Sequence, residues 1–143
     1  MNSHGYDDNN IFAKILRGEI PAHRVYEDDH TVAFMDVMPQ APGHMLVVPK
    51  SSSRNMLDAD PAVLAHTVQV VQKLARAAQD AFDADGITIM QFNEPAAGQT
   101  VFHLHFHVVP RHEGQPVRPH SGQMEDGEIL KANAEKVRTA LAS

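Results

Sequence analysis

The clearest pattern along the chain lies in the stretch 101–110, where apolar and polar positions alternate regularly from residue 102 to residue 108. Successive side chains of a β-strand point to opposite faces, so this alternation predicts a strand with one apolar and one polar face. The polar face carries three imidazoles roughly 6–7 Å apart along the strand, those of His103, His105 and His107. The apolar face, which we expect to point into a core, carries Phe102, Leu104, Phe106 and Val108.

Four other short apolar stretches, each bounded by turn residues, predict further strands. They cover residues 24–27, 31–36, 44–49 and 87–92. Because only an Asp-Asp-His turn separates the first two stretches, they are expected to form a hairpin.

Three segments show the periodicity of a helix. An asparagine pair at residues 9–10 can cap a short helix that reaches residue 17, and a final helix is expected over residues 125–141. Between them, Asp60 and Pro61 begin a long helix. Its apolar side is expected to consist of Leu64, Val68, Val71, Ala75, Ala78 and Phe82. The order of all these elements predicts a single α+β domain with about five strands in a mainly antiparallel sheet.

Composition excludes several classes of protein. A chain of 143 residues fits one domain, and a formal net charge of −6 argues against a general nucleic-acid-binding surface. The absence of cysteine excludes disulfides and zinc sites with Cys ligands. No apolar run approaches the roughly 20 residues of a membrane span, and the polar, acidic N-terminus is unlike a signal peptide. We therefore expect a cytoplasmic protein that associates with neither membranes nor nucleic acids.

Three interpretations of the histidine row follow from its chemistry. The imidazoles can be exposed residues on the wet face of a sheet, or metal ligands, although no carboxylate lies near them in the sequence. They can also serve phosphoryl or nucleotidyl transfer, with a histidine as nucleophile. The preceding loop supplies groups suited to phosphate, namely Asn93, Gln99, Thr100 and the backbone N–H groups near Gly98.

The segment His103-Leu-His-Phe-His-Val-Val109 resembles the His-φ-His-φ-His-φ-φ signature of the histidine triad (HIT) superfamily. Residues 9–21, 36–50 and 98–101 also resemble that superfamily, specifically its nucleotide hydrolase branch. The resemblance implies a HIT-like fold with a short N-terminal, a long central and a C-terminal helix. It also implies a HIT domain over residues 9–111, a flexible lead over 1–8, and an extension over 112–143 that belongs to the same domain.

The resemblance further implies a homodimer whose two sheets join, and hydrolysis or nucleotidyl transfer at the α-phosphorus of a purine nucleotide. Nucleoside phosphoramidates and dinucleoside polyphosphates are the expected substrates, and His105 is the expected nucleophile, forming a nucleotidyl-histidine intermediate. Its expected supports are His103, His107 and His44. The expected phosphate-binding residues are Asn93, Gln99 and Thr100. The expected ribose- and base-binding residues are Asp36, Val37, Ile11, Phe12, Ile15, Ile20 and Phe34.

The chain departs from some family members at a structural zinc site. Those members carry Cys-x-x-Cys at the positions of Asn10 and Ala13, and a histidine shortly after the Pro-Lys pair, where this chain has Ser51-Ser-Ser53. We therefore expect no metal and no cofactor. The alternative to catalysis is a module that binds or senses nucleotides without turning them over.

Overall fold

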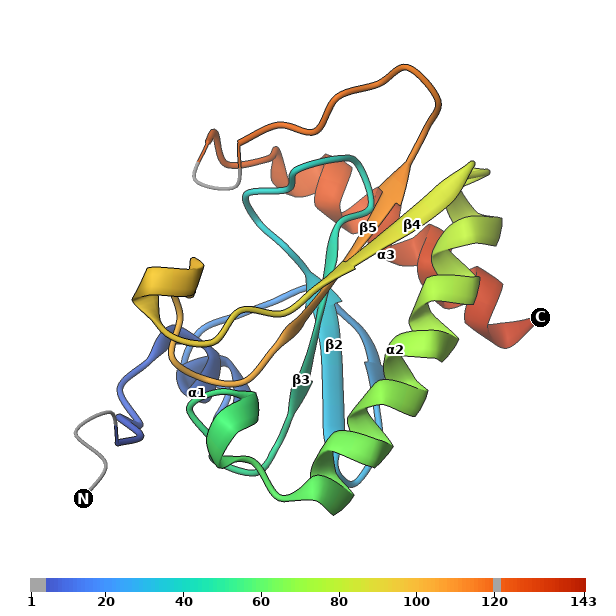
Figure 1. Ribbon diagram of the computed structural model, residues 1–143. Helices are drawn as coiled ribbons and strands as arrows, with labels where there is room; N and C mark the ends of the chain where they lie inside the picture. Colours follow the sequence, from blue (N-terminus) through green and yellow to red (C-terminus); the bar gives the residue numbers. More distant parts are fainter. Residues whose placement is uncertain (1–4, 120–121) are drawn as a thin grey trace.

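A computed structural model describes residues 5–119 and 122–143 of the chain. Its centre is one sheet of five strands in the order β1-β2-β3-β5-β4, and all neighbouring strands are antiparallel (Figure 1). The strands are β1 (Arg24–Glu27), β2 (Thr31–Met35), β3 (Met45–Pro49), β4 (Gly86–Met90) and β5 (Phe106–Arg111). This architecture confirms the predicted α+β class and the five-stranded antiparallel sheet.

The α-helices begin where the sequence supplies a side-chain cap. They are α1 (Ile11–Leu16), α2 (Pro61–Phe82) and α3 (Gly127–Ala142), and the 3-10 turns are η1 (Met56–Asp58) and η2 (Pro95–Ala97). The caps are Asn10, Asp60 and Asp126, whose side-chain oxygens accept from backbone N–H groups of the first turn. Such a cap contributes about 1 kcal/mol by satisfying an N–H that the helix leaves without a partner.

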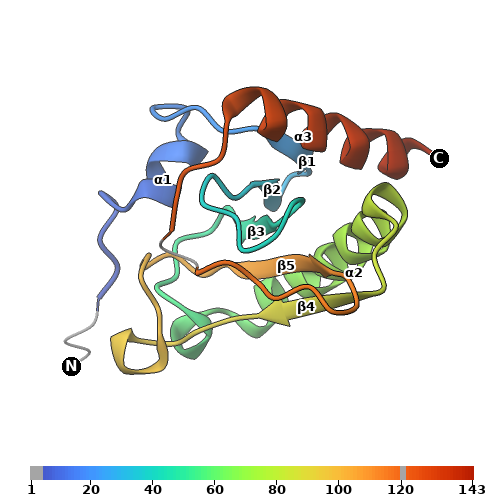
Figure 2. The same ribbon diagram turned by 90° about the horizontal axis from the view of Figure 1, so that it is seen from above.

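Helices cover both faces of the sheet, so β2 and β3 are buried along their whole length. In Figures 1 and 2, α2 and α3 lie on one side of the sheet and α1 on the other. Alternate residues of β2 and β3 therefore enter two different cores. The α2/α3 core includes Ala33, Met35, Met45, Val47, Leu74 and Val137. The α1 core consists of Phe12, Ile15, Val32, Phe34, Leu46 and Val48, with Ile20 packed against it.

The apolar side of α2 agrees with the predicted one except at Val68. Val68, expected in the core, is 50% exposed, whereas Val70 and Leu74 are buried. Thr67 and Ala77, which the prediction did not include, are also buried. Of the predicted residues, Val71 and Ala78 are buried, and Leu64, Ala75 and Phe82 are partly buried against the α2/α3 core.

The histidine strand is shorter than predicted. Strand β5 begins at Phe106, so His103 and His105 lie in a segment that precedes the sheet. The register pairs Val47 with Phe106, which would bring Pro49 opposite Leu104. Proline has no N–H to donate at that position, and Leu104 N donates instead to the carbonyl of Ser53.

The side chains of this irregular segment divide between the core and the surface. Leu104 and Phe106 enter the α2/α3 core as expected. Phe102 was also expected there, but its ring lies against the guanidinium of Arg54 and is only partly buried. The alternation of apolar and polar residues thus begins before the first residue of the observed strand β5.

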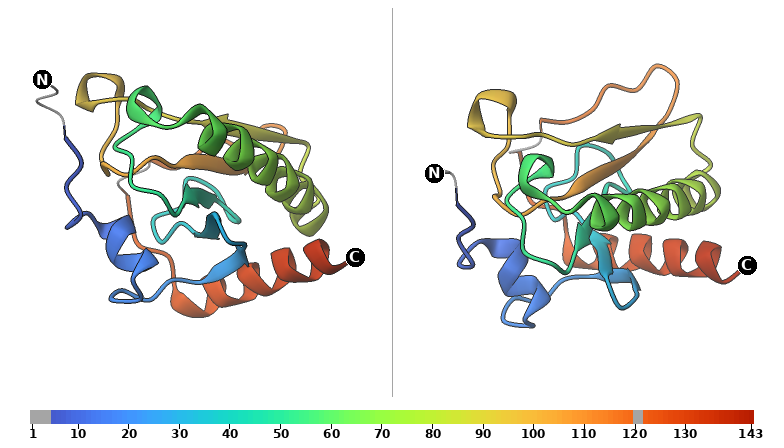
Figure 3. Two further views of the ribbon diagram at one scale, coloured as in Figure 1. Left: turned by 90° about the horizontal axis from the view of Figure 1, so that it is seen from below. Right: turned by 60° about the horizontal axis from the view of Figure 1, so that its bottom comes forward.

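The chain after β5 returns across the molecule before it forms α3. Arg118 N donates to Gln40 O, and Glu125 N donates to Val37 O, so this segment packs on the loop between β2 and β3. Arg138 of α3 donates to Arg24 O and ties the last helix to β1. At the opposite end of the sheet, η1 and η2 lie next to each other (Figure 3). Among the described residues, no helix has both the length and the apolarity that a membrane crossing requires.

Candidate functional site

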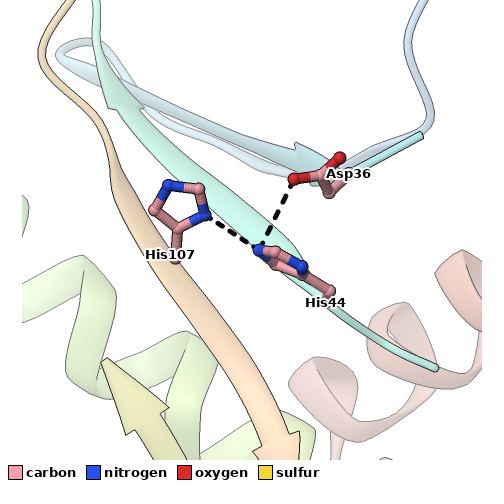
Figure 4. Close-up of side chains that lie close together, drawn as sticks. All are labelled: Asp36, His44 and His107. Atoms are coloured by element: carbon pink, nitrogen blue, oxygen red, sulfur yellow. Dashed lines mark hydrogen bonds and ion pairs between the residues drawn. The ribbon is translucent and has the colours of Figure 1, made fainter. Parts of the chain in front are cut away.

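Two histidines and one carboxylate meet on the α1 face of the sheet (Figure 4). His107 comes from β5, His44 directly precedes β3, and Asp36 directly follows β2. His107 pairs with Leu46, a member of the α1 core, which sets the face to which the imidazole points. Adjacent strands thus bring together residues that are up to 71 positions apart in the sequence.

Hydrogen bonds from the backbone assign the tautomers of this pair. Gln40 N donates to His44 Nδ1 over 3.0 Å, so neutral His44 carries its proton on Nε2. His44 Nε2 therefore donates to His107 Nδ1, which lies 2.9 Å away. Neutral His107 then carries its own proton on Nε2, where it can be donated to an anionic group.

Asp36 approaches the same nitrogen of His44 that faces His107, and we call this group of three side chains the relay (Figure 4). Its Oδ2 lies 3.5 Å from His44 Nε2, and its Oδ1 accepts from Met38 N over 2.8 Å. The carboxylate is buried, and its Oδ1 bond to Met38 N fixes the orientation of the side chain. The order of groups is Gln40 N–H, His44, His107, with Asp36 beside His44.

The same three side chains offer ligand atoms that all lie within 4.8 Å of one another. The fold thus supplies the carboxylate that the sequence lacks near the histidines. The hydrogen bonds nevertheless disfavour a metal centre, since His44 Nδ1 already accepts a proton from Gln40 N. A metal on Nε2 would require His44 to lose both ring protons, so the relay is the better description of the group.

His105 has the opposite tautomer. Its Nδ1 donates to the backbone carbonyl of His103 over 2.7 Å, so in the neutral ring the lone pair is on Nε2. The ring of Phe12 contacts it edge-on with 4.8 Å between centroids, and the ring of His107 lies 5.0 Å away. The side chain is 6% exposed. His105 thus combines a nucleophilic nitrogen with an apolar neighbour.

His103 forms hydrogen bonds through both ring nitrogens. Its Nε2 donates to Pro49 O over 2.8 Å, and the hydroxyl of Tyr6 donates to its Nδ1 over 2.6 Å. Burial lowers the pKa of His103, and the bond to the Pro49 carbonyl only partly offsets that effect. A neutral His103 is therefore an anchor for the irregular segment before β5. Tyr6 lies within the predicted flexible lead, of which residues 1–4 are outside the described part of the chain.

Gln99 is placed next to the site, but its side chain is fully engaged. Its Oε1 accepts from Asn55 Nδ2 and from Glu94 N, and its Nε2 donates to Arg54 O and Val101 O. Both protons and both lone pairs of the amide are used in this way. The side chain thus holds the loop together, and contact with a phosphate would need to come from the backbone or from its neighbours.

The other two expected phosphate residues differ in exposure. Asn93 Oδ1 accepts from Met56 N and Gln91 Nε2, and its Nδ2 donates to Gln91 Oε1. Thr100 is exposed at the end of the loop. Of the three residues, Thr100 has the side chain that solvent reaches most easily.

The apolar residues among those expected to bind the nucleoside fall into three groups. Phe12, Ile15, Ile20 and Phe34 gather in the α1 core, where the rings of Phe12 and Phe34 are 5.6 Å apart. Ile11 lies at the edge of α1 and is 44% exposed. Val37 packs instead against the core beneath α2 and α3, so the structure does not bring it to the apolar group.

Several residues at the site were not found from the sequence. They are Tyr6, Gln40, Arg54, Asn55 and Glu94. Gln40 acts through its backbone, and Tyr6 is separated from its partner by 97 positions, so no local pattern marks either. The one detectable signal was the capping box of Asn55 and Asp58 at η1.

Comparisons with known proteins converge on one family. The family model described as HIT domain matches residues 17–114, a span that contains the histidines of the site and Asp36. The crystal structure of a Hit-like protein from Bartonella henselae, involved in cell-cycle regulation and with an unknown ligand, gives a TM-score of 0.90 at 58% identity, covering 95% of this chain and 99% of that one. A Zn-bound histidine triad family protein from Mycobacterium smegmatis gives 0.84 at 36% identity, covering 94% of each chain. Adenylylsulfatase HINT3 of Arabidopsis thaliana is 36% identical over 103 residues, which are 72% of this chain and 52% of that protein.

Proposed function

The chain belongs to the HIT family, and we propose that it is a nucleotide hydrolase or nucleotidyl transferase that acts through His105. The observation that carries this proposal is the bond from His105 Nδ1 to His103 O, which leaves the Nε2 lone pair as the nucleophile. The name of the adenylylsulfatase relative supports hydrolysis of an adenylyl compound. The proposed substrates are nucleoside phosphoramidates and dinucleoside polyphosphates.

In the first step, His105 Nε2 attacks the α-phosphorus and forms a P–N bond. The bond from phosphorus to the leaving group breaks, and the leaving group departs with its electron pair and takes a proton from solvent. The nucleotidylated ring then carries a positive charge, which the His103 carbonyl stabilises through the Nδ1–H bond. A hydrogen bond to a charged group contributes about 1.5–3 kcal/mol, compared with about 0.5–1.5 kcal/mol for a neutral one, so this contact is stronger in the intermediate.

In the second step, a water molecule attacks the same phosphorus. The P–N bond breaks, its electron pair returns to His105 Nε2, and the water gives its proton to solvent, leaving a nucleoside monophosphate. The Nε2 proton of His107 is suited to a phosphate oxygen in both steps, because His44 holds the opposite nitrogen as an acceptor. An alcohol or amine in place of water would make the same step a nucleotidyl transfer.

The apolar side chains of the α1 core beside His105 favour a binding site for the purine base there. Phe12 contacts both Phe34 and His105, so a base stacked there would bring its α-phosphate close to Nε2. We assign the ribose hydroxyls to Asp36, whose carboxylate oxygens accept hydrogen bonds and whose position at the end of β2 adjoins the relay.

We also propose that the protein is a homodimer joined along β4. This strand is at the edge of the sheet and has β5 as its neighbour, and its residues are at most half-buried. Ile89 is 44% exposed and lies opposite Val108, so it points to the same face as α2. An exposed apolar side chain on an edge strand favours pairing with a second copy.

The decisive experiment compares His105→Asn with His112→Asn, a control outside the site. Adenosine phosphoramidate and a dinucleoside polyphosphate serve as substrates, AMP affinity is measured by calorimetry, and the covalent adduct is mapped by mass spectrometry. We expect His105→Asn to bind AMP normally but to lose at least about a thousandfold in turnover, since no other group replaces the nucleophile. Full activity in this variant would refute the mechanism. AMP binding by the wild type without turnover of any substrate would favour the alternative of a non-catalytic nucleotide-binding module.

A further inference from the structure

A charged pair outside the histidine group joins the loop after β3 to the loop after β4. The guanidinium of Arg54 binds the carboxylate of Glu94 through two hydrogen bonds, Nε to Oε2 at 2.8 Å and Nη2 to Oε1 at 2.9 Å. Asn55 Nδ2 donates to the same Oε2 over 2.6 Å. Because this bidentate pair is largely shielded from solvent, it is a stronger link than an exposed ion pair.

Glu94 has a backbone φ of 78°, a conformation that residues other than glycine rarely adopt. From there its carbonyl accepts from Ala97 N and Gln99 N, and its own N–H donates to Gln99 Oε1. The turn η2 therefore starts at a residue that needs external support. Arg54 and Asn55 supply that support from the neighbouring loop.

The same residues of the first loop also hold the histidine segment. The Arg54 guanidinium carbon lies 4.2 Å from the centre of the Phe102 ring. Ser53 O accepts from Leu104 N, and Arg54 O accepts from Gln99 Nε2. The loop thus contacts the residues on both sides of His103, namely Phe102 and Leu104. The His103 carbonyl between them orients His105. Since residues 101–105 have no strand pairing, these contacts and the bonds of the His103 ring take the place of the sheet.

We propose that Arg54 is a positioning residue for the reaction of His105. Its guanidinium fixes the His103 carbonyl through Phe102, next to the bond from Leu104 N to Ser53 O, and it fixes the loop 93–100 through Glu94. This inference rests on the proposed function, because the group that it positions is the proposed nucleophile. Lysine cannot replace arginine here, as it neither forms the bidentate pair nor stacks as a flat group on Phe102.

The test is Arg54→Lys, with Arg138→Lys as the matched control. Arg138 likewise binds a carboxylate and a backbone carbonyl, but in α3, away from the histidines. Two quantities are measured in each variant: the single-turnover rate of adduct formation from adenosine phosphoramidate, and the hydrogen exchange of the His105 Nδ1 proton by NMR. AMP affinity and the titre of active sites are measured beside them.

For Arg54→Lys we expect the rate constant per active site to fall roughly 5- to 30-fold and Nδ1 exchange to accelerate by at least about tenfold, with AMP affinity within about twofold of the wild type. A purely structural loss would lower the titre of active sites and leave the rate constant intact. Unchanged exchange and an unchanged rate constant in Arg54→Lys would overturn the inference. If the wild type itself forms no adduct, the proposed function fails, and the exchange measurement alone then decides whether Arg54 positions His105.

Discussion

Replacing His44 by phenylalanine tests whether its imidazole controls the protonation of His107. Phenylalanine fills a similar volume but neither accepts from Gln40 N nor donates to His107 Nδ1. His44 is fully buried, so water cannot easily replace either bond. Each lost bond to a buried polar group costs about 1–3 kcal/mol, which gives roughly 2–6 kcal/mol for the two. Because phenylalanine has no polar atoms of its own to bury, we expect a net loss of about 2–4 kcal/mol in the free energy of unfolding.

The effect on activity has a separate origin. Without the His44 donor, the proton of His107 can move to Nδ1, and a lone pair on Nε2 then faces the phosphate. The loss of one hydrogen bond to a charged group, about 1.5–3 kcal/mol, corresponds to a roughly 10- to 150-fold fall in turnover. Affinity for AMP is expected to fall less, because the base and ribose contacts remain.

Three measurements separate these effects. Urea unfolding gives the stability, steady-state kinetics on adenosine phosphoramidate give turnover, and ¹⁵N NMR of labelled histidine identifies the tautomer of His107. The control is His66→Phe, which removes a bond to Asp28 and leaves the relay intact. A His44→Phe protein that turns over substrate as fast as the control, with the His107 proton still on Nε2, would refute the relay.

Other predictions concern pH, assembly and the base. Because the pKa of His103 is lowered on folding, the unfolded chain binds more protons than the folded chain below about pH 6.5. As the pH is lowered from there, the free energy of unfolding should decrease by at most about 1.4 kcal/mol per pH unit. A His103 that titrates by NMR at or above 6.5 would contradict this. Ile89→Lys should raise the dimer dissociation constant at least about tenfold in sedimentation, whereas Val117→Lys, also at an exposed position, should not; a monomeric wild type would disprove the β4 interface. Phe12→Ala should weaken AMP binding roughly 5- to 30-fold through lost stacking, with the exposed Ile129→Ala as control, and equal affinities would exclude Phe12 from the base site.

The elements that sequence predicted well are those whose signal is local. The predicted caps at Asn10 and Asp60 lie next to the helices that they begin, and short apolar stretches marked all five strands. The predicted start of β5 was wrong because a strand extends only as far as a neighbouring strand offers backbone groups that can pair with it. Whether residues 101–105 join the sheet depends on Pro49, which is more than 50 positions away.

By itself, the sequence determined the fold class, the family and the identity of the candidate histidines, because alternation, caps and the triad signature are short-range features. Only the tertiary structure decided how these histidines differ. The tautomers depend on three backbone groups, Gln40 N, Pro49 O and His103 O, and on the directions in which the folded chain presents them. Tyr6, Arg54 and Glu94 join the site for the same reason, since hydrogen bonds between distant segments leave no periodic trace in a sequence.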